Sequence, residues 1–313
     1  MGLTIGVDIG GTKIAAGVVN EAGRILARVR RDTPPGDGPA TVDTIAAVIT
    51  ELATEHEVGG AGLGAAGFID AARSTVLFAP NLPWRKEPLR AEVEQRTGIP
   101  VVVENDANAA AWGEAMFGAG NGQAHTVMVT IGTGLGGGVV VNGRLLRGAF
   151  GVAAEIGHIN IVPDGRPCGC GNHGCWEQYA SGTALVREVR ELAGRDPGRA
   201  AGLLASGDGT PEGIKGPQVT AAAREGDPLA IEALATLGEW LGRGMADLAA
   251  ILDPRLFILG GGVSEAGHLI AAPARASFAA HLTAGEHRPK AEIRLAQLGQ
   301  DAGLIGAADL VRR

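Results

Sequence analysis

The chain has 313 residues, of which 45% are hydrophobic and 19% charged, and its formal net charge is −7. This length allows one large domain or two modest ones. The acidic balance and the absence of a Lys/Arg cluster argue against nucleic-acid binding, and no stretch has the roughly 18 consecutive apolar residues of a membrane span.

The N-terminal segment, MGLTIGVDIGG, lacks the charged region and the long apolar region of a secretory signal. We therefore expect the protein to lie in the cytoplasm, where thiols stay reduced. The cysteines number three, so they cannot all pair as disulfides.

The first part of the chain predicts strands separated by glycine turns. Residues 3–19, LTIGVDIGGTKIAAGVV, indicate strand, glycine turn and strand, and a turn at Asn20–Gly23 leads to a third strand. A helix over 40–56 and a strand over 60–70 follow. After a proline-rich loop, the expected elements are a helix over 89–98, ended by Gly98, and a buried strand over 99–106, which ends in Asn105 and Asp106.

The same plan then starts again. Residues 125–148, HTVMVTIGTGLGGGVVVNGRLLRG, repeat the strand, glycine turn and strand, and a shift of 122 positions places Ile9 on Ile131, Gly10 on Gly132 and Asn20 on Asn142. This weak internal repeat predicts two lobes that each offer a glycine turn to a shared cleft.

The last third alternates helices with strands. We expect a helix near 183–192, a loop-rich segment over 194–217, and a long helix from 227 with Asp227 as its N-cap and Pro228 in its first turn. Strands near 255–260 and 291–299 and a C-terminal helix over 301–313 complete an α/β fold.

The glycine turns are candidate phosphate sites, although neither common nucleotide motif is present. GTGLGG at 132–137 matches G-x-G-x-x-G, but the chain continues into a second strand instead of a helix, and no Walker sequence occurs. Each turn alone is more readily a plain hairpin. Consecutive backbone N–H groups at 8–13 and 130–134, with a third glycine run at 260–262, together favour a nucleotide cleft. Asp8 adds a carboxylate suited to a water-mediated Mg²⁺ contact.

All three cysteines lie in CGCGNHGCWE, residues 168–177. Their C-x-C-x₄-C spacing offers three ligands of the four that structural Zn²⁺ takes. Spacing nominates His173, inside the loop, and His158, ten residues before Cys168, equally well. Three thiols without a metal are the alternative, but the usual redox spacing C-x-x-C does not occur.

Five motifs in order resemble the ROK family (repressors, open reading frames and sugar kinases), and within it the bacterial glucokinases most. They are DIGGTK, ENDANAAAWGE, TIGTGLGGGVVVNGRLLRG, EIGH and CGCGNHGCWE, and the resemblance spans the chain from Asp8 to AGLIGAA at 302–308. It implies two actin-like (ribonuclease-H-like) α/β lobes around a central cleft, with the C-terminal helix packed on the first. We place the small lobe at 1–109 plus 300–313 and the large lobe, with the zinc loop, at 110–299.

The resemblance further implies ATP-dependent phosphorylation of glucose at its 6-hydroxyl, giving glucose 6-phosphate and ADP. Asp106, which by residue type alone is an ordinary helix cap, becomes the catalytic base. The implied sugar contacts are Gly67, Asn105, Asp106, Glu155, His158 and Glu177. The implied nucleotide contacts are Asp8, Gly10, Gly11, Thr12, Lys13, Thr133, Gly134, Gly261 and Gly262. The implied ligands of the structural Zn²⁺ are His158, Cys168, Cys170 and Cys175.

Several alternatives stay open at this point. The same chemistry on fructose, allose, N-acetylglucosamine or N-acetylmannosamine fits the motifs, and polyphosphate is a possible donor, although no basic track is visible in the sequence. A sugar-sensing repressor is disfavoured because the phosphate loop begins at Asp8 and leaves no room before it for a helix-turn-helix. Family habit implies a homodimer or homotetramer.

Overall fold

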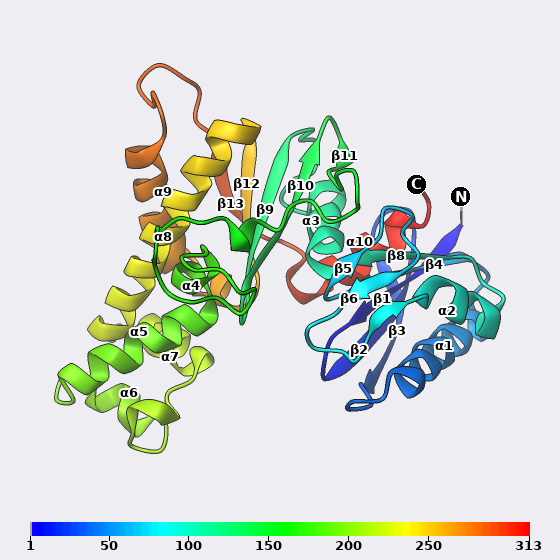
Figure 1. The fold of residues 1–313 in the computed structure, drawn as a ribbon, viewed down its shortest axis with the longest axis horizontal. Coiled ribbons are helices and arrows are strands. Elements are labelled where there is room, and N and C mark those ends of the chain that lie inside the picture. The colour runs from blue at the N-terminus through cyan, green and yellow to red at the C-terminus, as the bar shows by residue number, and fades with distance from the viewer. Residues whose placement is uncertain (1) are drawn as a thin grey trace. The chain divides into compact units, whose positions relative to one another are not determined.

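Two five-stranded sheets with the same strand plan organise residues 2–313, the part of the chain that the computed structural model describes (Figure 1). The first sheet has the order β3-β2-β1-β4-β8, and the second has the order β11-β10-β9-β12-β13. In the first sheet β1 pairs antiparallel with β2 and parallel with β4, which in turn pairs parallel with β8. In the second sheet β12 pairs parallel with both β9 and β13, and β10 pairs antiparallel with β11. The predicted internal repeat is therefore a repeat of topology.

The strands of the first sheet are β1 Leu3–Ile9, β2 Lys13–Val19, β3 Ile25–Asp32, β4 Val58–Ala65 and β8 Val101–Asn105. Those of the second are β9 Thr126–Ile131, β10 Leu135–Val141, β11 Arg144–Leu145, β12 Leu256–Gly260 and β13 Glu292–Leu295. A small third sheet contains β5 Phe68–Ile69, β6 Val76–Phe78 and β7 Arg85–Glu87. This third sheet occupies the segment that the sequence indicated only as a strand end and a proline-rich loop.

The helices are α1 Gly38–Glu55, α2 Leu89–Thr97, α3 Asp106–Phe117, α4 Glu177–Ala180, α5 Gly182–Arg195, α6 Ala201–Ala205, α7 Gly216–Arg224, α8 Pro228–Leu252, α9 His268–His281 and α10 Ala302–Leu310. None of those formed by residues 2–313 is both long and apolar enough to cross a membrane. Most predicted helices are confirmed, whereas α9 lies in a segment for which no element was predicted. The loop-rich segment 194–217 contains α6 and the start of α7.

The predicted helix ends have the expected local chemistry. The carboxylate of Asp227 accepts hydrogen bonds from the backbone N–H groups of Leu229 and Ala230, as an N-cap does. Gly98 ends α2 in the left-handed conformation, with φ 68°, which glycine adopts without a Cβ clash. The turn after β2 is held by the Asn20 side chain, which accepts from the N–H of Arg24 at 2.9 Å.

The chain divides into two compact units. The first contains the described residues through Ala124 together with Gly138–Ala154 and Gln297–Arg313, and the second contains His125–Gly137 and Glu155–Ala296. The first unit thus includes residues 110–124 and 138–154, which the sequence-based boundaries assign to the large lobe. Those boundaries remain a prediction about the lobes.

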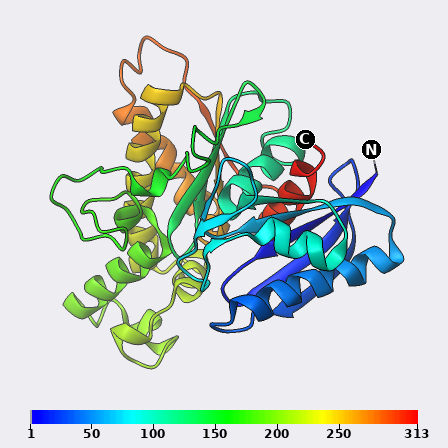
Figure 2. The same ribbon diagram turned by 45° about the vertical axis from the view of Figure 1, so that its right-hand side comes forward.

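In the first unit, α10 packs directly on the sheet and on α3, as the two views of the ribbon show (Figure 1, Figure 2). A Cβ on Gly6 of β1 would lie 1.9 Å from the Leu304 carbonyl oxygen, and one on Gly62 of β4 would lie 1.7 Å from that of Ala307. These two glycines therefore allow the helix backbone to approach the strands. The prediction that the C-terminal helix packs on the first lobe is confirmed within this unit.

In the second unit, α8 and α9 pack side by side. Glycines again permit the close approach, because a Cβ on Gly242 would lie 2.6 Å from the Ala274 carbonyl oxygen. Much of the glycine content of the chain therefore has a packing role as well as a role in turns.

Candidate active site and metal cluster

The first glycine turn connects β1 to β2 and leaves its middle exposed. The N–H of Gly10 donates to the carbonyl of Lys13 at 2.9 Å, and the Thr33 hydroxyl donates to the carbonyl of Gly10 at 2.7 Å. Gly11 and Thr12, at the tip, are exposed. The turn is thus braced from behind, and its tip is accessible to an anion.

Asp8 and Asp106 form a pair of carboxylates at the carboxyl end of the first sheet. Asp8 lies opposite Gly64 of β4, and the Cα of Asp106 lies 3.7 Å from the Cβ position of that glycine. Burial raises the pKa of Asp8 to about 6, the negative charge of Asp106 adds to the shift, and Lys13 opposes it. Burial also raises the pKa of Asp106, against hydrogen bonds from backbone N–H groups.

The N-cap of α3 is Asn105, the last residue of β8. Its side-chain oxygen accepts from the N–H of Asn108 at 3.0 Å, and its amide group donates to the carbonyl of Gly67 at 3.1 Å. Because Asn105 caps the helix, Asp106 is not used as a cap. Asp106, a residue that is partly exposed, is therefore not committed to capping the helix.

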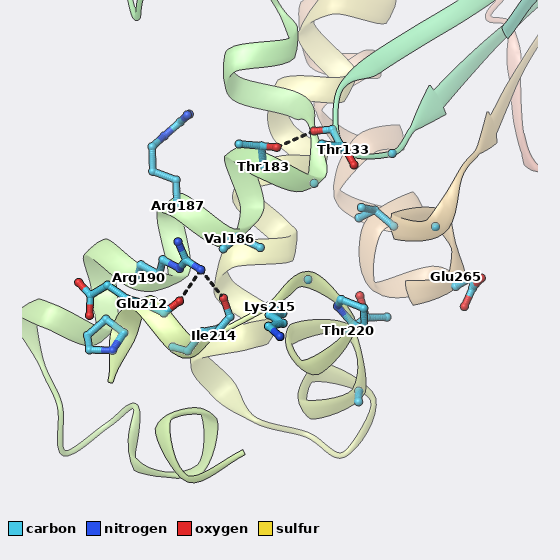
Figure 3. A pocket seen from close by; sticks show the side chains of 18 of the residues that line it. Thr133, Thr183, Val186, Arg187, Arg190, Glu212, Ile214, Lys215, Thr220 and Glu265 are labelled. Carbon is cyan, nitrogen blue, oxygen red and sulfur yellow. Dashed lines mark hydrogen bonds between the residues drawn. The ribbon is translucent and has the colours of Figure 1, made fainter. Parts of the chain in front are cut away.

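The second glycine turn connects β9 to β10 and rests on the start of α5. The N–H of Gly182 donates to the carbonyl of Gly132 at 2.8 Å, and the Thr183 hydroxyl donates to that of Thr133 at 2.8 Å (Figure 3). A Cβ on Gly134 would lie 2.9 Å from a carboxylate oxygen of Glu177. The turn is therefore fixed by α5 and lies beside a predicted sugar contact.

The third glycine run follows β12 and touches the end of β9. Gly261 has φ 82°, and a Cβ there would lie 2.5 Å from the carbonyl oxygen of Ile131. Space is open at the Cβ position of Gly262. The structure thus brings the second turn and the third run together within the second unit.

A cavity of about 1050 Å³ opens beside these two glycine segments, wholly within the second unit (Figure 3). Its polar lining includes Thr133, Thr183, Arg187, Arg190, Glu191, Glu212, Lys215, Thr220, Arg224 and Glu265. Arg190 donates to the carbonyls of Glu212 and Ile214 at 2.6 and 2.8 Å and so shapes one wall. Sequence reasoning found only the glycine segments of this cavity. The predicted helix near 183–192, which begins at Gly182 and Thr183 in the structure, was the sequence signal for another wall of the cavity.

The three cysteines and His158 converge in the loop that precedes α4. Their ligand atoms all lie within 4.8 Å of one another. The Cys170 and Cys175 Sγ atoms are 3.6 Å apart, and Nδ1 of His158 is 3.6 Å from Sγ of Cys168. A zinc tetrahedron with Zn–S bonds of about 2.3 Å has S···S separations of about 3.8 Å. The donor set and its spacing therefore fit Zn²⁺.

His173, the other ligand that spacing nominated, does not belong to this group of four. Its backbone carbonyl instead accepts from the Asn160 side chain at 2.8 Å. The loop is a small hydrogen-bonded unit, in which the Cys168 N–H donates to the carbonyl of Asn172 at 2.8 Å.

Two predicted sugar contacts adjoin the cluster. The thiol of Cys168 donates to Oε1 of Glu177 at 3.0 Å, and that oxygen lies 3.8 Å from Nδ1 of His158. Glu155 immediately precedes the 3₁₀ turn Ile156–His158 and is exposed. Because Nδ1 of His158 faces the thiols, its Nε2 is left for another partner.

Comparison with known proteins places the chain in a family. The ROK family model matches residues 4–313. Glucokinase from Streptomyces coelicolor is 56% identical over 312 residues, which cover 100% of this chain and 98% of that protein. The crystal structure of a ROK glucokinase from Streptomyces griseus in complex with glucose and AMPPNP matches with 57% identity and a TM-score of 0.90, covering 99% of both chains. A ROK hexokinase from Thermus thermophilus matches with 34% identity and a TM-score of 0.80, covering 98% of this chain and 96% of that one. The chain, with its actin-like α/β fold, therefore belongs to the ROK family.

Proposed function

We propose that the protein is a glucokinase that transfers the γ-phosphoryl group of ATP to the 6-hydroxyl of glucose, giving glucose 6-phosphate and ADP. The observation that carries this proposal is the full-length likeness to the Streptomyces griseus glucokinase that binds glucose and AMPPNP. The Asp8–Asp106 pair and the braced glycine turns supply the groups that such a reaction needs.

Asp106 is the proposed catalytic base. The glucose O6 forms a bond to the γ-phosphorus while the bond from that phosphorus to the β,γ-bridging oxygen breaks, and ADP leaves. The proton of the 6-hydroxyl moves to the carboxylate of Asp106. Asp106 is the first residue of α3, so its carboxylate lies close to the helix N-terminus. Most of the remaining rate enhancement comes from positioning and charge.

The proposed sugar contacts are polar side chains and the backbone of Gly67. Carboxylates and amides with fixed geometry suit adjacent hydroxyls, because their oxygens accept two hydrogen bonds with little rotation. Asn105 and the backbone of Gly67 are already joined by a hydrogen bond, which supports a shared role. The other proposed contacts are Asp106, Glu155, His158 and Glu177.

The proposed nucleotide site uses the glycine segments. Gly10, Gly11, Thr12 and Lys13 in the first turn, and Thr133 and Gly134 in the second, are proposed to contact phosphates. Gly261, Gly262 and the adjoining cavity are proposed to hold the adenosine. Asp8 is suited to hold Mg²⁺ through water, and that ion would neutralise charge on the phosphates.

The proposed Zn²⁺ site is architectural. Four protein ligands leave no open position, so the ion would hold the loop and not take part in the reaction. With Nδ1 of His158 directed at the thiols, Nε2 is oriented for a sugar hydroxyl. Elemental analysis of wild type and His158→Ala tests this, since the variant should lose zinc and raise the glucose KM. A variant that retains both zinc and sugar affinity would contradict the assignment.

The remaining proposals concern the setting of the enzyme. The proposed zinc ligands include three thiols, which the cytoplasm keeps reduced, and this supports a cytoplasmic location. A homodimer or homotetramer is proposed by analogy with the family.

The decisive experiment measures ADP release by the purified protein with ATP–Mg²⁺ and a panel of hexoses. Sugar-dependent ADP should form fastest with glucose. If no hexose supports ADP formation, the enzyme assignment fails. Replacing ATP by polyphosphate in the same assay tests the donor.

Another hexose is the second candidate substrate. N-acetylmannosamine kinase from Yersinia pseudotuberculosis is 34% identical to this chain over 310 residues. The panel therefore includes fructose, allose, N-acetylglucosamine and N-acetylmannosamine. A higher kcat/KM for any of these than for glucose would transfer the proposal to that sugar.

A further inference from the structure

Glu104 is a buried carboxylate that the proposed mechanism does not use. It occupies the residue of β8 just before Asn105, and its side chain is 1% exposed. A buried charge is costly unless it is paired. Its partners should therefore show what it does.

One carboxylate oxygen of Glu104 is directed at the first turn of α3. Oε1 accepts from the backbone N–H of Asn105 at 3.0 Å and from the side-chain amide of Asn108 at 3.2 Å. Asn105 is the N-cap of the helix that begins with Asp106. The carboxylate thus fixes the backbone on one side of the proposed base and a side chain on the other.

The other oxygen faces two arginines. Oε2 lies 2.8 Å from Nε of Arg147 and 3.2 Å from Nε of Arg73. These contacts are ion pairs and not aligned hydrogen bonds. Burial lowers the pKa of Arg73, with Glu104 opposing the shift and Arg147 adding to it. The carboxylate is therefore held between two cations.

Arg147 is in turn anchored to the backbone. Its guanidinium donates to the carbonyls of Asp70 and Ala71 at 2.8 and 3.0 Å. The carbonyl of Arg73 accepts from the N–H of Val103 in β8 at 3.1 Å. The guanidinium of Arg147 and the backbone of Arg73 are thus both hydrogen-bonded to other segments of the first unit.

We propose that Glu104 and Arg147 are positioning residues for the proposed base Asp106 and for the proposed sugar contact Asn105. The contacts run from Arg147 to Glu104, and from Glu104 to the backbone and side chain on either side of Asp106. This inference rests on the proposed function. A misplacement of a catalytic group by about 1 Å can cost about 10²-fold in rate. Loosening the contacts of Glu104 should therefore slow the reaction.

The test compares Glu104→Gln, which removes the charge and keeps the size, with Arg147→Lys, which keeps the charge and loses the two-carbonyl anchor. Glu51→Gln is the matched control, because Glu51 pairs with Arg31 at the surface of the same unit. Steady-state rates give kcat and the KM values for glucose and ATP. A variant that merely folds less completely lowers kcat and changes neither KM.

We expect Glu104→Gln to lower kcat about 10–100-fold and to raise the glucose KM, with the ATP KM unchanged. Arg147→Lys should do the same more weakly. The double variant should lose little more than Glu104→Gln alone, because both residues act through one contact. The control should match wild type.

The outcomes separate this inference from the proposed function. If Asp106→Ala abolishes turnover while Glu104→Gln retains wild-type kcat and glucose KM, the positioning role is wrong and the base assignment stands. If wild type shows no sugar-dependent ADP, the proposed function itself fails. If Glu104→Gln gives no cooperative thermal transition, Arg147→Lys decides, and wild-type values for that variant overturn the inference.

Discussion

At the carboxyl end of β1 stands Asp8, whereas the equivalent position in β9, 122 residues later, is Thr130. The contrast extends along both sheets. In the first sheet β8 is followed by Asp106, whereas its counterpart in the second sheet, β13, is followed by Ala296 and Gln297. The repeat therefore supplies the glycine turns, with their proposed phosphate donors, twice, but these carboxylates only in the first sheet.

This difference separates two tasks on one strand plan. A carboxylate can accept a proton or hold a cation, whereas a glycine turn offers only N–H groups and space. We therefore expect substitutions at the first sheet to change turnover and its pH dependence. Substitutions at the second sheet should change the affinity for ATP.

The largest effect is expected for Asp106→Asn. The amide keeps the size of the side chain but cannot accept the proton of the glucose hydroxyl, so kcat should fall by about 10²–10⁴-fold. Glucose binding, measured by calorimetry, should persist. Turnover near that of wild type would remove Asp106 from the mechanism and break the proposed division between the sheets.

Asp8 gives the next largest effect, and it is dependent on pH. Its pKa is raised to about 6, so the carboxylate is protonated as the pH falls through 6 and can no longer hold a cation. The kcat/KM of wild type should therefore decline below about pH 6. Asp8→Asn should lower kcat about 10–100-fold at neutral pH. An acid limb near pH 4 in wild type would contradict this.

The same raised pKa makes Asp8 a source of instability above pH 6. The folded state binds the proton more tightly than the unfolded chain does, so the stability contributed by this group falls as pH rises from 3.8 to about 6. Asp8→Asn should therefore raise the Tm by a few degrees at pH 7.5. The gain should disappear near pH 4, and an equal gain at both pH values would assign it to another cause.

At the second sheet, Gly261→Ala tests the nucleotide side. Alanine at φ 82° is strained, and its Cβ would lie 2.5 Å from the Ile131 carbonyl oxygen, so the glycine run must shift. The ATP KM should rise about tenfold, a shift equivalent to about 1.4 kcal/mol, while the glucose KM stays constant. Gly198→Ala is the control, because it lies outside the cavity lining and a Cβ there would be 3.5 Å from the nearest atom, a carboxylate oxygen of Asp196. An equal rise in the glucose KM would contradict the separation of tasks.

The features of the fold and of the candidate site that the sequence could predict are those with local signals. The strands of the first sheet are bounded by glycine and asparagine turns, and Asp227 is followed by Pro228 at the start of α8, so these elements have markers within a few residues. The cysteine spacing likewise indicated a metal. These signals do not depend on tertiary contacts.

The parts that could not be predicted depend on contacts distant in sequence. Asn105 and Asp106 are both good capping residues, and only the extended backbone of Asn105 decides between them. The helix α9 contains Pro273, which ordinarily disfavours a helix interior but here packs against Gly238 of α8. The choice of His158 over His173 came from the family resemblance, because spacing alone allowed both.

The smallest expected effect compares two threonines that brace the two turns in the same way. The Thr183 hydroxyl donates to the Thr133 carbonyl at 2.8 Å, and the Thr33 hydroxyl donates to the Gly10 carbonyl at 2.7 Å. Thr→Val removes the hydroxyl and keeps the shape. One lost hydrogen bond is worth about 0.5–1.5 kcal/mol, so each variant should raise the ATP KM about 2–10-fold.

The two variants should differ in their effect on kcat. Thr183→Val should leave kcat unchanged, because the second turn carries no carboxylate. Thr33→Val should also lower kcat, because the first turn begins two residues after Asp8. A looser turn moves Lys13, whose charge opposes the rise in the Asp8 pKa. If both variants change only the ATP KM, the two turns are equivalent phosphate sites, and the asymmetry between the sheets is confined to Asp8 and Asp106 themselves.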